Sequence, residues 1–354
     1  MSKTRGKASA TAPTVTILGI GQMGLVCANV LAAADRQSPL RNSVRVWGHN
    51  ADEAGRLSQT RVSPRLPGLV LHDDVRVALS DVEALADTDV IVSAIPVQFI
   101  RSAWERLAPA TPTSAGIVSV AKGVENDTLL RPTQVISEVL GDDPDGRPRD
   151  IGVLSGPTIA AELARCLPAT MVAASEMPRF ALRLQELFAT SWLRVYTHQD
   201  MLGVELAGAT KNIIAIAAGI LDGLNAGFNA KSALLARGLA EIARLGAALG
   251  ASPETFFGIA GVGDLATSCF SPEGRNRSCG EALGRGEPLR DYLARTPSVV
   301  EGVATTRSVL DLAARYRVEM PITEAVHAVL FESLDPLEAI SGLMRRELKS
   351  ERVG

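Results

Sequence analysis

A glycine pattern near the N-terminus constrains the fold most strongly. Residues 14–24 read TVTILGIGQMG, so that Gly19, Gly21 and Gly24 follow a short apolar run and precede an apolar helical pattern. In such a strand–turn–helix the first glycine permits a tight turn, the second lets the backbone approach a pyrophosphate, and the third lets helix and strand pack closely. The helix N-terminus offers N–H groups and a positive dipole end to the anion. The pattern predicts a dinucleotide-binding turn; the alternative is a structural turn without a ligand.

Strand patterns alternate with helical patterns as far as about residue 190, and from about Gly203 the pattern is helical. Such alternation favours an α/β fold, with an N-terminal Rossmann-type, mostly parallel sheet followed by an all-α C-terminal domain. The predicted strands are 15–18, 44–47, a short one at 69–71, 89–95, 117–120, 151–154, 169–173 and 193–196, with helices through about Ala34 and at 178–189. The predicted units are a disordered extension (1–13), a dinucleotide-binding domain (14–199), a helical substrate and catalytic domain (200–345) and a tail (346–354), with 141–148 as a surface loop.

Composition excludes several classes of function. A net charge of −3 and an aromatic content of 4% argue against a nucleic-acid partner. The basic, polar N-terminal segment lacks an apolar core, and the longest apolar stretch, Ile213–Leu221, is too short to span a bilayer, so we expect no membrane insertion. The four cysteines lack zinc-site spacing, which indicates no metal and the reduced thiols of a cytoplasmic protein.

Lys211 is the strongest candidate for catalysis. It lies in the segment 204–219, and beyond Asn212 this helix is apolar on every face, which predicts burial. Lysine is almost never fully buried without a partner, and desolvation lowers its pKa toward that of a usable general base. The alternative is a lysine whose stem is buried while its amine reaches solvent.

The end of the second predicted strand bears on the choice of dinucleotide. An Asp or Glu at this point binds the adenosine ribose and repels a 2′-phosphate. Here the strand runs into Trp47-Gly48-His49-Asn50 instead. His49 has the chemistry to donate to a 2′-phosphate, so NADP is allowed alongside NAD; the alternative is that His49 is only a surface loop residue.

Further polar residues stand where apolar segments end. Lys122 follows a predicted strand, at the sheet edge where open α/β folds bind ligands. Asp264 follows a glycine-rich turn, where it is either a functional acid or a helix N-cap. Arg275 and Asn276 suit a phosphate or carboxylate, because a guanidinium binds two oxygens at once; the alternative is a solvated basic turn.

Together these segments resemble the NAD(P)-dependent glycerol-3-phosphate dehydrogenases of the bacterial type, over residues 14–331. The matching stretches include LSGPTIAAE (154–162), ELAGATKNIIAIAAGI (205–220), GVGDLATSC (261–269), GRNR (274–277) and VVEGVATT (299–306). The resemblance implies that dihydroxyacetone phosphate and glycerol 3-phosphate are interconverted by hydride transfer with NADP or NAD, in support of phospholipid synthesis. It also implies a homodimer.

The resemblance assigns roles to individual residues. It makes Lys211 the general base for the C2 hydroxyl, Lys122 a contact to cofactor and substrate, and Asp264 the acid beside the catalytic lysine. The implied substrate contacts also include Gly156, Thr158, Gly274, Arg275 and Asn276. The implied cofactor contacts are Gly19, Gly21, Gln22, Met23, Gly24, His49, Lys122, Ala160, Arg275, Val299 and Glu301. The family often has serine where Gly274 stands, so one hydroxyl contact is expected to be missing, and the loop 35–42 is longer than is typical.

Two other functions remain open from the sequence. One is another two-domain hydroxyacid or keto acid reductase of the same design, such as a ketopantoate reductase. The other is a dinucleotide-binding sensor without turnover. The Ser-Gly-Pro-Thr turn and Gly274-Arg275-Asn276 favour a phosphorylated substrate, and the presence of Lys122, Lys211 and Asp264 favours an enzyme.

Overall fold

The fold is taken from a computed structural model that describes residues 13–33, 42–141, 149–296, 298–348 and 350–351. The predicted extension (except Pro13), nearly all of the loop 35–42 and most of the turn 141–148 lie outside the described residues. The N-terminal part is one sheet in the order β3-β2-β1-β4-β5-β6-β7-β8. Its strands are β1 (Thr14–Leu18), β2 (Ser43–Trp47), β3 (Val75–Ala78), β4 (Val90–Ser93), β5 (Gly116–Ser119), β6 (Ile151–Ser155), β7 (Ala169–Ala174) and β8 (Leu193–His198).

The sheet is mostly parallel, as predicted, with one reversal. Every described pair of neighbouring strands is parallel except β6 and β7, which pair antiparallel through Val153–Ala174 and Ser155–Val172. A parallel neighbour needs a long crossover, usually a full helix. The link from β6 to β7 contains only the five-residue α6 (Ala160–Ala164), so the chain returns in the opposite direction. Side-chain periodicity carries no information on strand direction, and the sequence therefore did not show this reversal.

The predicted strand at 69–71 is wrong. Leu69 and Leu71 are buried and Val70 is exposed, which gives the alternation of a strand, but Val70 forms only an isolated bridge with Val62. The Asn29 side chain takes the place of a strand partner, because it donates to the Val70 carbonyl and accepts from the backbone N–H of His72. The edge strand is β3 instead, a few residues later.

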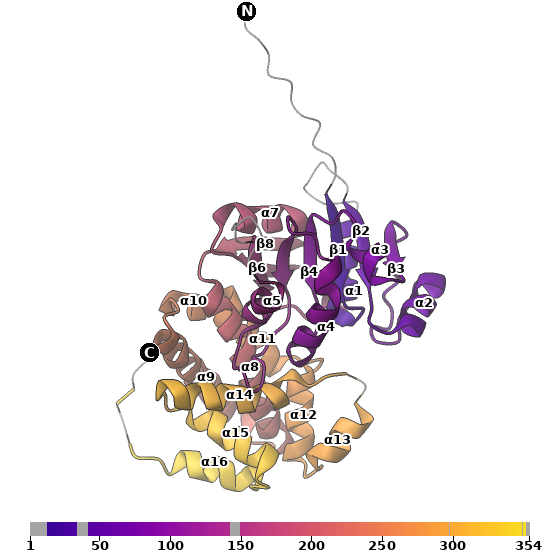
Figure 1. The fold of residues 1–354 in the computed structure, drawn as a ribbon. Coiled ribbons are helices and arrows are strands. Elements are labelled where there is room, and N and C mark those ends of the chain that lie inside the picture. Colours follow the sequence, from indigo (N-terminus) through magenta and orange to yellow (C-terminus); the bar gives the residue numbers. More distant parts are fainter. Residues whose placement is uncertain (1–12, 34–41, 142–148, 297, 349, 352–354) are drawn as a thin grey trace, which may run out of the picture.

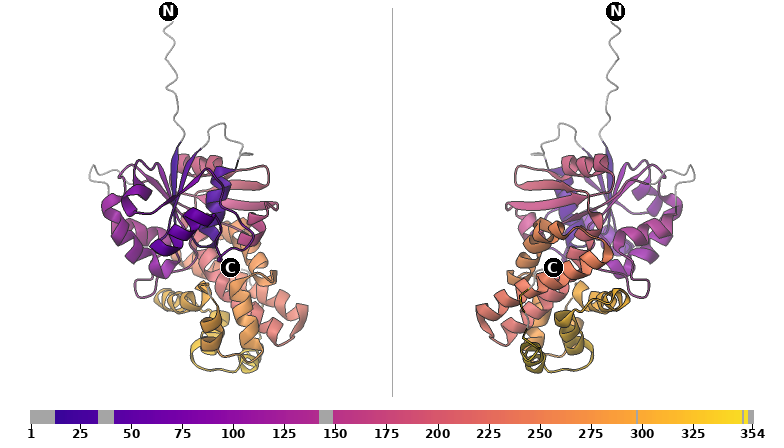
Figure 2. Two further views of the ribbon diagram at one scale, coloured as in Figure 1. Left: turned by 90° about the vertical axis from the view of Figure 1, so that its right-hand side faces the viewer. Right: turned by 90° about the vertical axis from the view of Figure 1, so that its left-hand side faces the viewer.

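Helices cover both faces of the sheet, as Figures 1 and 2 show. On one face, α1 (Gln22–Ala32) packs on β1 and β2, and α7 (Pro178–Phe188) packs on β6, β7 and β8. On the other, α3 (Asp81–Leu85), α4 (Ile100–Leu107) and α5 (Pro132–Leu140) enclose a second core around Trp104. The helix α2 (Ala51–Thr60) follows β2. With both faces covered, the open edge at the carboxyl ends of the parallel strands is left for a ligand.

All described elements after β8 are helical. They are α8 (Met201–Gly223), α9 (Gly227–Leu249), α10 (Pro253–Phe257), a π-helical turn (Ile259–Gly263), α11 (Asp264–Phe270), α12 (Arg275–Gly284), α13 (Leu289–Arg295), α14 (Glu301–Tyr316), α15 (Pro321–Phe331) and α16 (Pro336–Met344). Their shared core is built around α8, and the loop residue Val124 from the sheet domain joins it.

The helix α8 extends well beyond the apolar stretch Ile213–Leu221. By length and composition it could cross a membrane, and it is the one described helix that meets this criterion. Its apolar window is, however, wholly buried inside the fold. Figure 1 shows it surrounded by the other C-terminal helices, which is the position of a core helix.

Glycines let α8 and α12 approach backbone to backbone. A Cβ atom on Gly219 would lie 1.9 Å from the Arg277 carbonyl oxygen, and one on Gly280 would lie 1.9 Å from the Ile216 carbonyl oxygen. At this contact, glycine rather than alanine is what allows the two helices to pack so closely. This contact fixes the start of α12, where Arg275 and Asn276 lie, relative to α8.

Candidate active site

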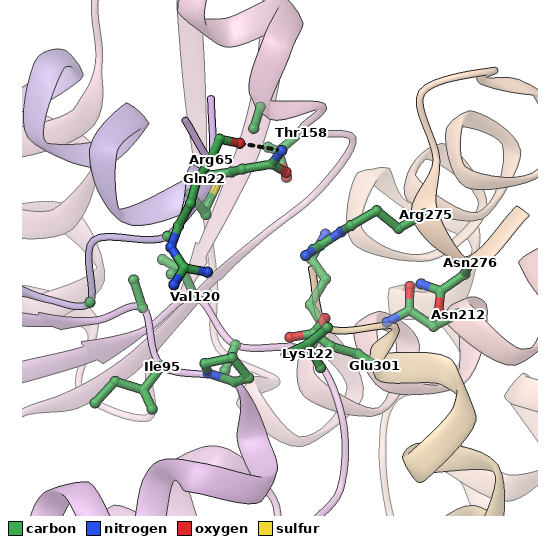
Figure 3. Close-up of a pocket in the computed structure, with 18 of the residues that line it drawn as sticks. Gln22, Arg65, Ile95, Val120, Lys122, Thr158, Asn212, Arg275, Asn276 and Glu301 are labelled. Carbon is green, nitrogen blue, oxygen red and sulfur yellow. Dashed lines mark hydrogen bonds between the residues drawn. The ribbon is translucent and has the colours of Figure 1, made fainter. Parts of the chain in front are cut away.

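A cavity of about 720 Å³ lies where the carboxyl ends of the strands meet the helical domain. Its size falls within the range of small-molecule and cofactor sites. Its wall contains fourteen of the predicted site residues, from both parts of the chain: Gly19, Gly21, Gln22, Met23, His49, Lys122, Thr158, Ala160, Lys211, Gly274, Arg275, Asn276, Val299 and Glu301. Gly24, Gly156 and Asp264 do not line it. Figure 3 shows Lys122, Arg275 and Glu301 on one side of the opening and Gln22 and Arg65 on the other.

The glycine turn fits a dinucleotide pyrophosphate. A Cβ on Gly24 would lie 1.9 Å from the Gly19 carbonyl oxygen, so α1 can pack this close to the turn only with glycine there. A Cβ on Gly21 would meet nothing within 4 Å, because it would project into the open cavity. No side chain caps the N-terminus of α1, whose backbone N–H groups are left to bind an anion.

Two lysines meet on one buried carboxylate. Lys211 Nζ lies 2.6 Å from Asp264 Oδ1, and Lys122 Nζ lies 2.5 Å from Asp264 Oδ2. Lys211 also donates to Ser268 Oγ at 2.6 Å, and Lys122 to the Gly156 carbonyl at 3.1 Å. Asp264 is 1% exposed and stands behind the two amines. Gly156 and Asp264 do not line the cavity themselves, but each contacts a lysine that does.

Lys211 is buried, with 6% of its surface exposed, so its amine does not reach bulk solvent along an extended stem. Burial lowers the pKa of this amine from 10.5 to about 8. The Asp264 carboxylate opposes that shift, and the neighbouring Lys122 charge adds to it. An amine with this pKa can both accept and release a proton near neutral pH.

Asp264 is not an N-cap. It is the first residue of α11, and Gly263 occupies the cap position after the π-helical turn. Gly263 is itself in the helical conformation (φ −62°, ψ −51°), so Asp264 lies inside a continuous helical segment. Because both of its oxygens bind lysines, the carboxylate holds two cations side by side at the cavity wall.

Arg275 and Asn276 form the first turn of α12, after the N-cap residue Gly274. The Arg275 guanidinium points into the cavity in Figure 3, and the side-chain amides of Asn212 and Asn276 lie on the same side. Asn276 Oδ1 accepts the Gly302 N–H at 2.9 Å, which leaves its NH₂ as the group that can donate to a ligand. Helix N–H groups, a guanidinium and an amide together form an anion site. Glu301 faces it, and burial raises the pKa of that carboxyl against the lowering effect of Arg275.

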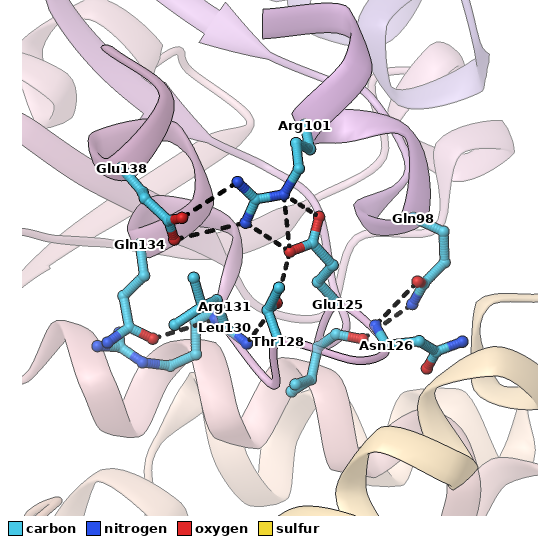
Figure 4. Close-up of polar contacts among 10 residues, drawn as sticks. Gln98, Arg101, Glu125, Asn126, Thr128, Leu130, Arg131, Gln134 and Glu138 are labelled. Atoms are coloured by element: carbon cyan, nitrogen blue, oxygen red, sulfur yellow. Dashed lines mark hydrogen bonds and ion pairs between the residues drawn. The ribbon is translucent and has the colours of Figure 1, made fainter. Parts of the chain in front are cut away.

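The loop that follows Lys122 is held by a polar network from the sheet domain (Figure 4). Gln98 Nε2 donates to the Val124 carbonyl at 2.9 Å, and Gln98 Oε1 accepts the Asn126 N–H at 3.0 Å. Arg101 pairs with Glu125 at 2.8 Å. From the helical domain, Ser308 Oγ also donates to the Val124 carbonyl at 2.9 Å. The position of the Lys122 backbone is therefore set by both domains.

Sequence reasoning missed several residues of the cavity wall. Asn212 adjoins Lys211 on the same apolar helix, and its buried Nδ2 has no hydrogen-bond partner. The argument from burial that selected Lys211 applies equally to this amide. Ser268 lies one turn after Asp264 and was detectable as a polar residue on the same helix. Arg65 and Phe99 also line the cavity. They are far in sequence from the glycine turn, and no local pattern marked them.

Comparison with known proteins decides the family. The family models "NAD-dependent glycerol-3-phosphate dehydrogenase N-terminus" and "C-terminus" match residues 14–181 and 200–341. The chain belongs to the NAD-dependent glycerol-3-phosphate dehydrogenase family. The resemblance inferred from the motifs is thereby confirmed.

Individual relatives agree with membership of this family. The chain is 44% identical to glycerol-3-phosphate dehydrogenase (NAD(P)+) 2 of Mycobacterium bovis over 342 residues, which cover 96% of this chain and 99% of the relative. The crystal structure of glycerol-3-phosphate dehydrogenase from Coxiella burnetii matches with a TM-score of 0.88 at 33% identity, covering 95% and 99% of the two chains. A ketopantoate reductase from Ralstonia eutropha shares the fold at a TM-score of 0.58 and 16% identity, covering 92% and 99%.

Proposed function

We propose that this chain is an NAD(P)-dependent sn-glycerol-3-phosphate dehydrogenase that interconverts dihydroxyacetone phosphate and glycerol 3-phosphate. The observation that carries the proposal is the buried Lys211 amine, paired with Asp264 beside Lys122, in the same cavity as the glycine turn and Arg275. Family membership at 44% identity supports it. The nicotinamide, when bound, supplies the acceptor or donor of the hydride.

The side chains of the cavity carry out proton transfer, charge stabilisation and substrate binding. In alcohol oxidation the Lys211 amine accepts the C2 hydroxyl proton, and the Lys122 ammonium stabilises the negative charge that develops on that oxygen. Asp264 positions both amines. Arg275, Asn276 and the α12 N-terminus bind the phosphate and so hold C2 at a fixed distance from Lys211. In the reverse direction, the protonated Lys211 returns its proton to the carbonyl oxygen as the hydride arrives at C2.

The test is a substrate comparison. Purified protein is mixed with NADPH or NADH and either dihydroxyacetone phosphate or ketopantoate, and the absorbance of the reduced nicotinamide is followed. We expect loss of absorbance with dihydroxyacetone phosphate and formation of glycerol 3-phosphate. Turnover of the keto acid alone would favour the related reductases, and tight nucleotide binding without any turnover would favour a sensor.

The activity should depend on pH through Lys211. Oxidation needs the neutral amine, so its kcat/KM should rise with pH and level off above about 8. Reduction needs the ammonium form, so its kcat/KM should fall as pH rises through the same value. Rates measured in both directions across this range check the prediction; two profiles with the same slope would contradict it.

Asp264→Asn should move these profiles. The Asp264 carboxylate raises the Lys211 pKa, so its removal should shift the midpoint of both profiles to lower pH. It should also reduce turnover, because neither amine would keep its charged partner. A midpoint that stays in place in the variant would show that Asp264 does not act on the titrating group.

Gln98 should act as a positioning residue for Lys122. Gln98→Ala removes both hydrogen bonds to the loop backbone, and we expect kcat/KM to fall about tenfold at unchanged fold. Gln134→Ala is the matched control, because Gln134 also bonds a backbone N–H, at Arg131, but farther along the loop from Lys122. Equal effects of the two variants on kcat/KM would argue against a specific role for Gln98.

The proposal also covers the cellular role, the oligomeric state and the domain roles of the enzyme. Glycerol 3-phosphate made by this reaction would supply phospholipid synthesis in the cytoplasm. The chain would act as a homodimer of two-domain subunits, with residues 14–199 binding the dinucleotide and residues 200–345 carrying the catalytic lysine. Light scattering on the purified protein tests the oligomeric state, and a monomeric mass at working concentration would remove that part of the proposal.

A further inference from the structure

The end of β2 presents no free carboxylate to an adenosine ribose. Gly48, His49 and Asn50 follow the strand, and the Asn50 side chain caps α2 by accepting the Glu53 N–H at 3.0 Å. Glu53, one helical turn later, does line the cavity. It is the group near this position with the chemistry to bind ribose hydroxyls, and its pairing therefore bears on the choice of cofactor.

Arg65 forms an ion pair with the Glu53 carboxylate. Its guanidinium binds both Glu53 oxygens, through Nε to Oε1 and through Nη2 to Oε2, the latter at 3.0 Å. Arg65 is the main reason that the pKa of Glu53 lies below its ordinary value, and His49 and Arg56 add to the effect. Glu53 is therefore an ion-paired carboxylate surrounded by positive charge. The neighbouring acid, Asp52, is exposed and does not line the cavity.

The guanidinium is also placed for a ligand. The Gln22 side chain, in the first turn of α1, donates to the Arg65 backbone carbonyl at 2.8 Å, which fixes this loop against the glycine turn. From there the Arg65 side chain extends into the cavity (Figure 3). The pairing with Glu53 uses Nε and Nη2, so the remaining N–H groups of the guanidinium are free to bind an anion. The Arg65 side chain is 40% exposed. Exposed ion pairs contribute little net free energy. A phosphate can therefore compete with Glu53 for the guanidinium at low cost.

The geometry points to Arg65 as the residue that selects NADP over NAD, by binding the 2′-phosphate together with His49. The inference rests on the proposed dinucleotide site and names which cofactor that site prefers. A phosphate monoester is a stronger partner for a guanidinium than a ribose hydroxyl, because its hydrogen bonds are charge-assisted and can be bidentate. His49, also on the cavity wall and close enough to Glu53 to lower its pKa, is a second donor.

The test measures binding alone, on the full chain. NADPH, NADH, 2′,5′-ADP and 5′-AMP are titrated into wild type, Arg65→Gln, Glu53→Gln and Arg179→Gln at one ionic strength. Arg179→Gln is the matched control, because Arg179 is an exposed arginine that also pairs with a carboxylate, that of Asp150 at 3.1 Å, but does not line the cavity. We expect Arg65→Gln to weaken NADPH and 2′,5′-ADP about tenfold or more, while NADH and 5′-AMP keep the wild-type affinity. Arg179→Gln should leave all four unchanged, and Glu53→Gln should leave NADPH binding intact or tighter.

Three outcomes would overturn the inference. Wild type could bind NADH as tightly as NADPH; Arg65→Gln could weaken both nucleotides equally; or Glu53→Gln could weaken NADH about tenfold, which would make Glu53 a ribose ligand. None of these involves turnover, so they are distinct from failure of the proposed dehydrogenase activity. Retained NADH binding by Arg65→Gln shows that the variant is folded.

Discussion

Lys211→Met is expected to reduce turnover by about 1,000-fold or more in both directions, because general acid–base catalysis contributes factors of this size. Methionine keeps the length and burial of the side chain but cannot carry a proton. Asp264 keeps Lys122 as its partner, so no buried charge is left unpaired. The measurement is single-turnover oxidation of bound NADPH after addition of dihydroxyacetone phosphate.

Two controls separate catalysis from structure. NADPH affinity and the unfolding temperature of Lys211→Met should remain near those of the wild type. Lys231→Met is the matched variant, because Lys231 is 5% exposed, close to the 6% of Lys211, and pairs with Asp222 outside the cavity. It should affect stability more than the chemical step. A loss of only a few-fold in Lys211→Met, or equal losses in the two variants, would show that Lys211 is structural.

Arg275→Gln should raise the KM for dihydroxyacetone phosphate about 100-fold, because removal of a charged partner from a ligand anion costs on the order of 2–5 kcal/mol. The guanidinium faces the cavity from the start of α12, where the helix N-terminus and Asn276 supply the other donors. Steady-state kinetics at saturating NADPH check the expectation.

The unphosphorylated ketone provides the control for this second variant. Dihydroxyacetone has the same reacting carbon but no phosphate, so its low kcat/KM should be the same in wild type and Arg275→Gln. If both substrates lose activity equally, Arg275 acts on the cofactor or on the fold, and the phosphate site lies elsewhere.

The sequence could predict those features that depend on residues close together in the chain. The glycine spacing at 19–24 and the apolar runs around it specify the first β–α unit, and they place one end of the cavity. Lys211 was detectable because a charged residue on a helix that is apolar all round requires a partner. The partner itself was less certain, since Asp264 after a glycine turn looks equally like an N-cap.

The features that the sequence could not give depend on long-range geometry. The bridge from Lys211 through Asp264 to Lys122 joins residues from three separate elements. Arg65 reaches the cavity from a distant loop that is held by Gln22 and by the ion pair with Glu53. The antiparallel β7 and the loss of the strand at 69–71 follow from a short connection and from the side chain of Asn29. Each of these outcomes depends on tertiary contacts that override a local pattern.

A direct NMR titration of the Lys211 side-chain amine, assigned by comparison with Lys211→Met, gives the sharpest test of the account. A proton acceptor held away from water by the fold should titrate at about 8, and its midpoint should fall further in Asp264→Asn. A midpoint near the ordinary lysine value of 10.5, unchanged in the variant, would contradict the account.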